Sequence, residues 1–178
     1  ARSLIWQGRT VEAEAILNGY DPESLNEFEL DRWGIARVAN LQWVIGDTDA
    51  AADVLAMLQR RIVHRGLRLV VDGLAAALLV LDCRLQEALE SAHRVVDEPD
   101  APAVAIGWAV FGGAMAAALM GRTAEAAELL ARGHDVSDRI DGMSRFLMAF
   151  GEIRSLTLAA EFDSALARSG AVVRITSN

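Results

Sequence analysis

Charged and apolar positions in this chain recur with the period of an α-helix. Between residues 84 and 97, Glu87, Glu90, Arg94 and Asp97 follow one another at steps of three or four, with Leu, Ala and Val between them. This stripe predicts an amphipathic helix with one face in water. The segment 123–141 has the same pattern, so a second helix of this kind is expected there.

Other segments are apolar nearly all round. The segment 67–82 carries few charges and 102–120 carries none, which is typical of helices buried on every side. We therefore expect apolar inner helices that alternate with amphipathic outer ones. The expected helices are 1–7, 10–18, 24–45, 48–65, 67–82, 84–97, 102–120, 123–141 and 144–161, followed by a short helix and a frayed or extended end from Gly170 to Asn178.

A short motif recurs at the junctions between these segments. The hexapeptide GRTVEA at 8–13 returns as GRTAEA at 121–126, with related hexapeptides at 46–51, 83–88 and 160–165. The closing alanines, called the repeat alanines below, follow one another at nearly equal intervals, at positions 13, 51, 88, 126 and 165. This period predicts a tandem repeat of helix pairs. The glycines at 8, 46 and 121 suit a left-handed helix end, and we expect the threonines at 10, 48 and 123 to cap the following helix.

The Gly-x-x-x-Glu-Ala turn at 8–13 and 121–126 resembles the middle of the tetratricopeptide repeat (TPR), although the period here is longer than is usual for that repeat. The resemblance implies an all-α fold, a right-handed superhelix of about four to five antiparallel helix hairpins, or TPR-like α-solenoid. We expect one such domain over residues 1–178, cut from a longer polypeptide.

The longer repeat resembles the helical region of large LuxR-type transcriptional regulators of the maltose-regulator class, and residues 32–41 are similar to its first-helix pattern. In that family an NTPase module precedes the repeats and a helix-turn-helix module follows them. This chain has no phosphate-loop motif and no helix-turn-helix signature, so neither activity is implied for it. The resemblance implies a bacterial, cytoplasmic module for sensing or coupling.

The composition of the chain limits the kinds of partner that it is expected to bind. The net charge is −8, so the chain repels phosphate backbones and direct nucleic-acid binding is not expected. A single cysteine, Cys83, fits a reducing cytosol. No histidine or cysteine spacing suggests a metal ligand set, and no cofactor is expected. We expect a protein or small-molecule effector as the partner, with a homodimer as a further option.

Polar and aromatic residues on the inner helices are the candidate binding groups. Trp33 and Trp108 hold equivalent repeat positions, since each precedes its own repeat alanine by the same interval. They are interpreted first as core between repeats, and alternatively as the wall of a concave groove. A charge on an inner helix must be paired or face water. The candidate groove residues are Trp33, Arg37, Asn40, Asp72, Trp108, Phe111, Met115, Glu152 and Arg154.

Two further segments have alternative interpretations. The uncharged run 101–121 has the length of a membrane span, but its small residues and repeat register favour a close-packed helix or a subunit contact, without membrane association. The arginines at 60, 61, 65 and 68 surround His64. We interpret these arginines as cations at a helix C-terminus, where they complement the helix dipole, in preference to a phosphate site.

Three functions follow from these patterns. The first is a non-catalytic ligand- or protein-binding sensor domain of a transcriptional regulator. The second is a free-standing TPR-like adaptor or oligomerisation scaffold. The third, an enzyme on a helical scaffold, lacks a nucleophile–base pair or a phosphate loop in the sequence, so no catalytic residue is assigned.

Overall fold

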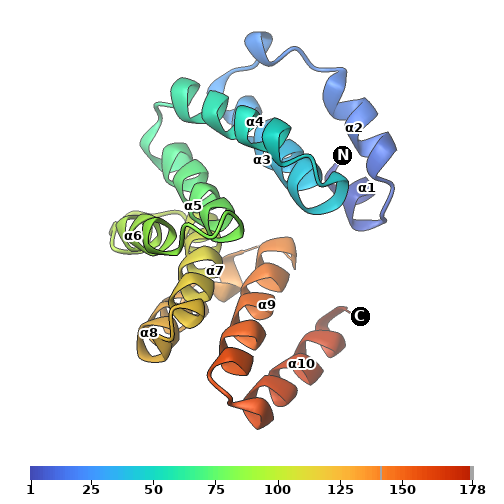
Figure 1. The fold of residues 1–178 in the computed structure, drawn as a ribbon. Helices are drawn as coiled ribbons and strands as arrows, with labels where there is room; N and C mark the ends of the chain where they lie inside the picture. The colour runs from blue at the N-terminus through green and yellow to red at the C-terminus, as the bar shows by residue number, and fades with distance from the viewer. Residues whose placement is uncertain (141, 177–178) are drawn as a thin grey trace. The chain divides into compact units, whose positions relative to one another are not determined.

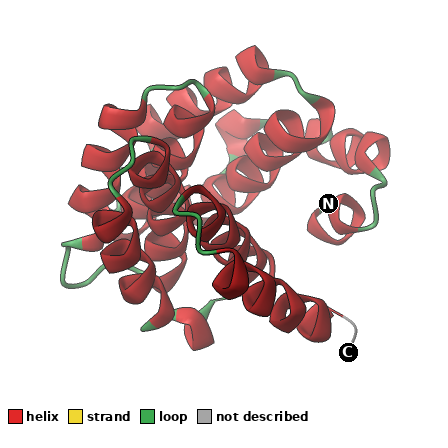
Figure 2. Cartoon of the chain, turned by 60° about the horizontal axis from the view of Figure 1, so that its bottom comes forward, coloured by secondary structure: helices red, strands yellow, loops and turns green. Residues whose placement is uncertain are grey.

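The computed structural model of the chain consists of helices joined by short loops (Figure 2). It describes residues 1–140 and 142–176, apart from the side chains of residues 2, 6, 142–144 and 171–176. No strand occurs in this part of the chain, so the expected all-α class is confirmed. The helices are α1 (Arg2–Trp6), α2 (Thr10–Asn18), η1 (Pro22–Ser24), α3 (Glu27–Asn40), η2 (Leu41–Ile45), α4 (Thr48–Arg61), α5 (Arg65–Leu81), α6 (Leu85–Val96), α7 (Ala103–Leu119), α8 (Thr123–His134), η3 (Ser137–Arg139), α9 (Gly142–Leu158) and α10 (Phe162–Thr176) (Figure 1).

The chain forms two compact units, Ala1–Val71 and Asp72–Asn178, with the boundary inside α5. In the first unit, α3 packs against both α2 and α4. The helix α3 starts at a capping box, in which the Asn26 side chain accepts the Glu29 amide and the Glu29 carboxylate accepts the Asn26 amide. Asp21 caps the separate 3₁₀ turn η1. For this reason the helix begins at Glu27 and not at the expected position 24.

The helix α3 runs into a single π turn, η2, which sequence inspection did not predict. A π turn holds one residue more than an α turn, because its hydrogen bonds join residues five apart. The distance from the start of each helix to its repeat alanine agrees with this extra residue. The helices α5, α7 and α9 all begin at the same interval ahead of their own repeat alanines, whereas α3 begins one residue farther ahead of Ala51.

In the second unit, α7 is the central helix and contacts α6, α8 and α9. Its glycines allow this close approach. A Cβ on Gly112 would stand 2.6 Å from the Ala76 backbone of α5, and one on Gly113 would stand 2.5 Å from the Ala92 side chain of α6. Most of the uncharged run between residues 105 and 118 is therefore core, which favours the close-packed helix. No helix in the described part of the chain is long and apolar enough to cross a bilayer.

The five junctions share one backbone conformation. Residues 8, 46, 83, 121 and 160 all have positive φ, at 70°, 81°, 59°, 76° and 62°. Each lies five residues before one of the repeat alanines, and those five alanines are all buried. Three of the positive-φ residues are the predicted glycines, whereas Cys83 and Ala160 adopt the conformation without being glycine. The period found in the sequence is thus also a period of the backbone.

The hydrogen bonds of the junctions repeat as well. In four of them, the amide after the left-handed residue donates to the carbonyl five residues earlier, as Arg84 does to Leu79 at 2.9 Å. The next helix begins at once, because the alanine amide donates to the carbonyl four residues before it. The residues at 9, 47, 84, 122 and 161 therefore occupy the N-cap position. Capping by the threonine hydroxyls was a wrong prediction, since the threonines at 10, 48 and 123 lie one residue inside the helix.

Two predicted helix ends also differ from the structure. The helix α8 stops at His134 and not at 141, because the chain turns through Val136 into the short 3₁₀ helix η3. The last helix, α10, is 15 residues long and includes positions 170–176, which were expected to be frayed or extended. Positions 177–178 lie outside the described residues.

Candidate functional site

A cavity of about 450 Å³ opens in the first unit between α1, α2 and α3. Apolar side chains form most of its wall, and Ser3, Glu29 and Arg32 add polar groups. Its volume lies within the range of ligand pockets. The apolar lining residues are Ala1, Ile16, Leu17, Tyr20, Leu25, Trp33 and Ala36.

Trp33 is the one residue of the predicted groove that lines this cavity. The residue is 7% exposed, and its indole Nε1 donates to the Leu17 carbonyl of α2 at 2.9 Å. Trp33 is thus largely buried, as the core interpretation expects, and it also forms part of a cavity wall, as the alternative interpretation expects. The hydrogen bond fixes the ring against α2, so the wall is held in a single orientation.

Behind the cavity wall, a polar cluster joins α2 to α3. The Glu14 carboxylate lies 3.0 Å from Arg37 and accepts from the Asn40 side chain at 3.1 Å. Arg37 also donates to the Asn18 side chain, and its guanidinium carbon lies 5.2 Å from the Trp33 ring centroid. Arg37 and Asn40 are thus brought together with Trp33, as the predicted groove requires, but as structural partners of α2.

Two buried side-chain oxygens of α3 lack a hydrogen-bond partner among the described residues: Asn40 Oδ1 and Asp31 Oδ1. Asn40 is fully buried. Burial raises the pKa of Asp31 to about 6, since no cation compensates for the lost hydration of its carboxylate. An isolated, partly buried carboxylate on α3 is a costly feature that sequence inspection did not single out.

In the second unit, the other predicted groove residues separate into core and surface. Trp108 and Phe111 are buried in α7, and Met115 and Asp72 are half-buried. Gly151 of α9 approaches Phe111 closely enough that a Cβ would lie 3.2 Å from its ring. Arg154 is exposed on α9.

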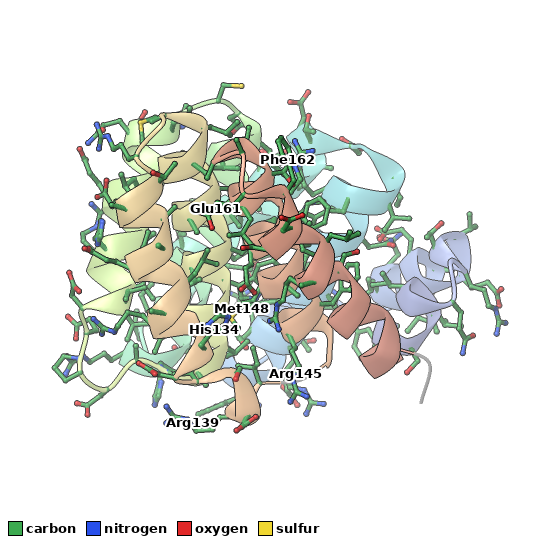
Figure 3. All side chains as sticks on the ribbon, turned by 90° about the horizontal axis from the view of Figure 1, so that it is seen from below. His134, Arg139, Arg145, Met148, Glu161 and Phe162 are labelled. Atoms are coloured by element: carbon green, nitrogen blue, oxygen red, sulfur yellow. The ribbon has the colours of Figure 1, made fainter. Side chains whose placement is uncertain are left out.

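Glu152 stands at the centre of a small charged group in that unit. Its carboxylate lies 2.5 Å from Arg168 Nε of α10 and 3.3 Å from His134 Nε2 at the end of α8. The Arg168 contact is an ion pair without hydrogen-bond alignment. Figure 3 shows His134 beside Met148 of α9. The group ties the last three helices together, and we assign it to structure.

The basic cluster around His64 is also engaged within the first unit. Arg61 donates to the Pro22 carbonyl at 2.7 Å, and Arg68 donates to the Gln59 carbonyl. The Glu27 carboxylate accepts the His64 amide at 2.7 Å and the Val63 amide at 2.8 Å. These backbone hydrogen bonds hold the pKa of Glu27 below its ordinary value. The arginines in the last turn of α4 favour the helix-end interpretation.

The described side chains contain no group of three or more His, Cys, Asp or Glu residues placed to hold a metal ion. The cavity offers apolar contact and a few charges, which suit binding. Its lining residues on α2 and in the following loop, such as Ile16, Tyr20 and Leu25, were missed by sequence inspection. The sequence signal for this surface was Tyr20, which lies seven residues after its repeat alanine. The other repeats carry Leu, Val or Gly at that position.

No protein-family model, no curated protein and no solved structure matches this chain.

Proposed function

We propose that this chain is a non-catalytic binding module, a TPR-like α-solenoid of helix pairs that wind into a right-handed superhelix. The observation that carries the proposal is the set of five junctions with positive φ, each five residues before a buried alanine. Structural repeats that stack on their neighbours present extended surfaces, and such proteins use those surfaces for binding.

We further propose that the module senses or couples a signal within a LuxR-type bacterial transcriptional regulator, with a protein or a small effector as its partner. The GRT-x-EA junctions and the longer period support this proposal. The cavity beside Trp33 is the candidate recess for that partner, since the indole hydrogen bond to Leu17 holds part of its apolar wall in place. The acidic net charge fits a protein or apolar partner better than a nucleic acid.

The test is a substitution inside the cavity of the complete regulator. Ala36→Trp should fill the recess and abolish the response to the inducing signal, while DNA binding in the absence of signal stays at the parental level. A matched control is Val63→Trp, at a position that is exposed in the same unit and away from the cavity. A regulator that responds normally with Ala36→Trp would overturn the proposal.

The competing function is a free-standing adaptor or oligomerisation scaffold. A contact through the uncharged segment 102–120 is disfavoured, since most of its side chains between residues 105 and 118 are buried within the chain. A different surface keeps the alternative open: Phe146 and Phe150 are exposed on α9, although Phe111 at the same repeat position as Phe150 is buried. Concentration-dependent self-association that is lost in Phe150→Asp, in a polypeptide without NTPase or helix-turn-helix modules, would favour the scaffold.

A further inference from the structure

A large apolar side chain recurs at one exposed position of the repeat. Seven residues before their repeat alanines, the five repeats carry Trp6, Val44, Leu81, Leu119 and Leu158. In the second unit, Leu81, Leu119 and Leu158 end the helices α5, α7 and α9, and they are 40%, 45% and 45% exposed. Val44 in the first unit is 46% exposed. Because Leu158 is as exposed as Leu119, its exposure does not follow from the place of α9 in the chain.

The junctions between the helices do not require an apolar side chain at this position. Their repeated hydrogen bonds join backbone groups, as between the Arg122 amide and the Ala117 carbonyl at 2.8 Å. A single exposed leucine is ordinary on a protein surface, whereas apolar side chains that gather on one face mark interaction sites. Leu81, Leu119 and Leu158 of the second unit are called the leucine row below.

The three helices that carry the leucine row pack closely against one another. A Cβ on Gly73 of α5 would stand 2.6 Å from the Ala105 carbonyl of α7. On α9, Ser155 Oγ donates to the Ala114 carbonyl of α7 at 3.3 Å. Helices in such contact have axes about 8–10 Å apart. Since the leucines hold equivalent positions on these helices, successive members of the row are about equally far apart.

We infer that the leucine row is a docking surface for a segment of a partner protein in the extended polyproline conformation, with an apolar residue at every third position. The inference rests on the proposed binding function and adds a partner class at a second place on the chain. A polyproline helix has three residues per turn and rises 3.1 Å per residue, so its side chains on one face are about 9 Å apart. Neighbouring side chains on one face of a helix or strand are only about 5–7 Å apart.

The charges beside the row define the polar part of the partner. Arg154 precedes Leu158 by four residues, so the two side chains share one face of α9. Arg154 is exposed, and its side chain has no ion pair or hydrogen bond with another described residue. The helix α7, which carries Leu119, has no charged residue. A carboxylate next to the last apolar residue of the partner segment complements Arg154, while uncharged residues face α7.

A synthetic peptide with this pattern is the probe: acetylated and amidated Leu-Pro-Pro-Leu-Pro-Pro-Leu-Glu. Titrated into the whole 178-residue protein, it should bind saturably and shift the NMR signals of backbone amides at the ends of α5, α7 and α9. Leu119→Ser and Leu81→Ser should each weaken binding by about tenfold. The matched control is Leu166→Ser, at a leucine of α10 that is 74% exposed and lies outside the row. It should change binding by less than about twofold, and circular dichroism verifies that the variants fold.

An exchange of charges tests the assignment of Arg154. Arg154→Glu should weaken binding of the peptide by about threefold to tenfold. A second peptide, in which lysine replaces the glutamate, should bind the parent protein weakly and regain affinity for Arg154→Glu. A role of Arg154 in folding alone would give no such recovery.

Three results would contradict the inference: no binding at about millimolar peptide, equal weakening by Leu119→Ser and Leu166→Ser, or a dimer of the free protein that Leu119→Ser dissociates in sedimentation. The last result would assign the row to a second copy of the chain. Failure here is distinguishable from failure of the proposed function. A regulator that loses its response with Ala36→Trp, but whose leucine row ignores the peptide, keeps the proposed function and loses only this partner.

Discussion

Cys83 and Gly121 hold the same position in successive repeats and share a left-handed backbone conformation, with φ of 59° and 76°. Each is followed by an arginine whose amide donates to the carbonyl five residues back, at 2.9 Å for Arg84 and 2.8 Å for Arg122. A residue with a Cβ adopts positive φ at a cost of about 1 kcal/mol. The junction therefore imposes its geometry even where the side chain opposes it.

Substitution of a junction glycine should show whether the left-handed backbone or the lack of space for a side chain determines the change in stability. A Cβ on Gly121 or on Gly170 would meet no atom within 4 Å, but only Gly121 has positive φ. We predict that Gly121→Ala lowers the free energy of unfolding by about 1 kcal/mol. Gly170→Ala, inside α10, should raise it by a similar amount. Urea unfolding of both variants measures this, and changes of the same sign would refute the backbone explanation.

The repeat alanines should tolerate no larger side chain. Ala126 is 2% exposed where α8 starts, so Ala126→Leu should lower the free energy of unfolding by about 1–3 kcal/mol through overpacking. The neighbouring Ala127 is exposed on the same helix, and Ala127→Leu should change stability by less than about 0.5 kcal/mol. If thermal denaturation gave equal effects for the pair, the alanines would not mark a tight helix contact.

The Trp33 hydrogen bond to Leu17 should contribute to the stability of the cavity wall. Trp33→Phe keeps an aromatic ring but removes the indole donor from the Leu17 carbonyl, which then accepts only the Tyr20 amide at 3.4 Å, at an expected cost of about 1 kcal/mol. Tyr20→Phe, on the exposed side of the same cavity, is the control and should be nearly neutral. Chemical denaturation compares the two, and a neutral Trp33→Phe would mean that the wall is held by packing alone.

Asp31 should make stability depend on pH. Its folded-state pKa, raised to about 6 by burial, exceeds the ordinary value, so the native protein holds this proton more tightly than the unfolded chain does. The stabilising contribution is present below about pH 4 and is lost as pH rises through about 6. Because the group is partly exposed, we expect a loss of roughly 1 kcal/mol.

The variant Asp31→Asn should cancel this loss. Relative to the parent, it should be more stable at about pH 7.5 and unchanged at about pH 4. Guanidinium unfolding at the two pH values provides the comparison. An equal effect of the substitution at both values would show that Asp31 titrates normally in the folded protein.

The helical class, the repeat period and three of the five left-handed positions could be predicted from the sequence. Glycine indicates a left-handed backbone, and a recurring alanine indicates close helix packing. The sequence was insufficient for Cys83 and Ala160, whose conformation follows from the register and not from the residue type. The π turn at 41–45 was hidden for a different reason: it is the last turn before Gly46, so too few positions follow the extra residue to shift a readable apolar pattern.

Prediction of the candidate site was less complete. Residue type pointed to Trp33, Arg37 and Asn40, and the structure gathers these three around Glu14 and Asn18 of α2. The cavity itself was not predictable, because Ile16 and Tyr20 have the apolar character of ordinary core positions. Their exposure depends on what packs against α2, and a pattern within α2 carries no information on that.

The backbone φ of Cys83 and Ala160, measured by NMR scalar couplings in the intact protein, tests the repeat most directly. Neither residue is a glycine, so neither adopts positive φ unless the junction requires it. The repeat account predicts positive φ at both, as at Gly8, Gly46 and Gly121. A negative, helical φ at either position would break the five-fold equivalence and contradict the account.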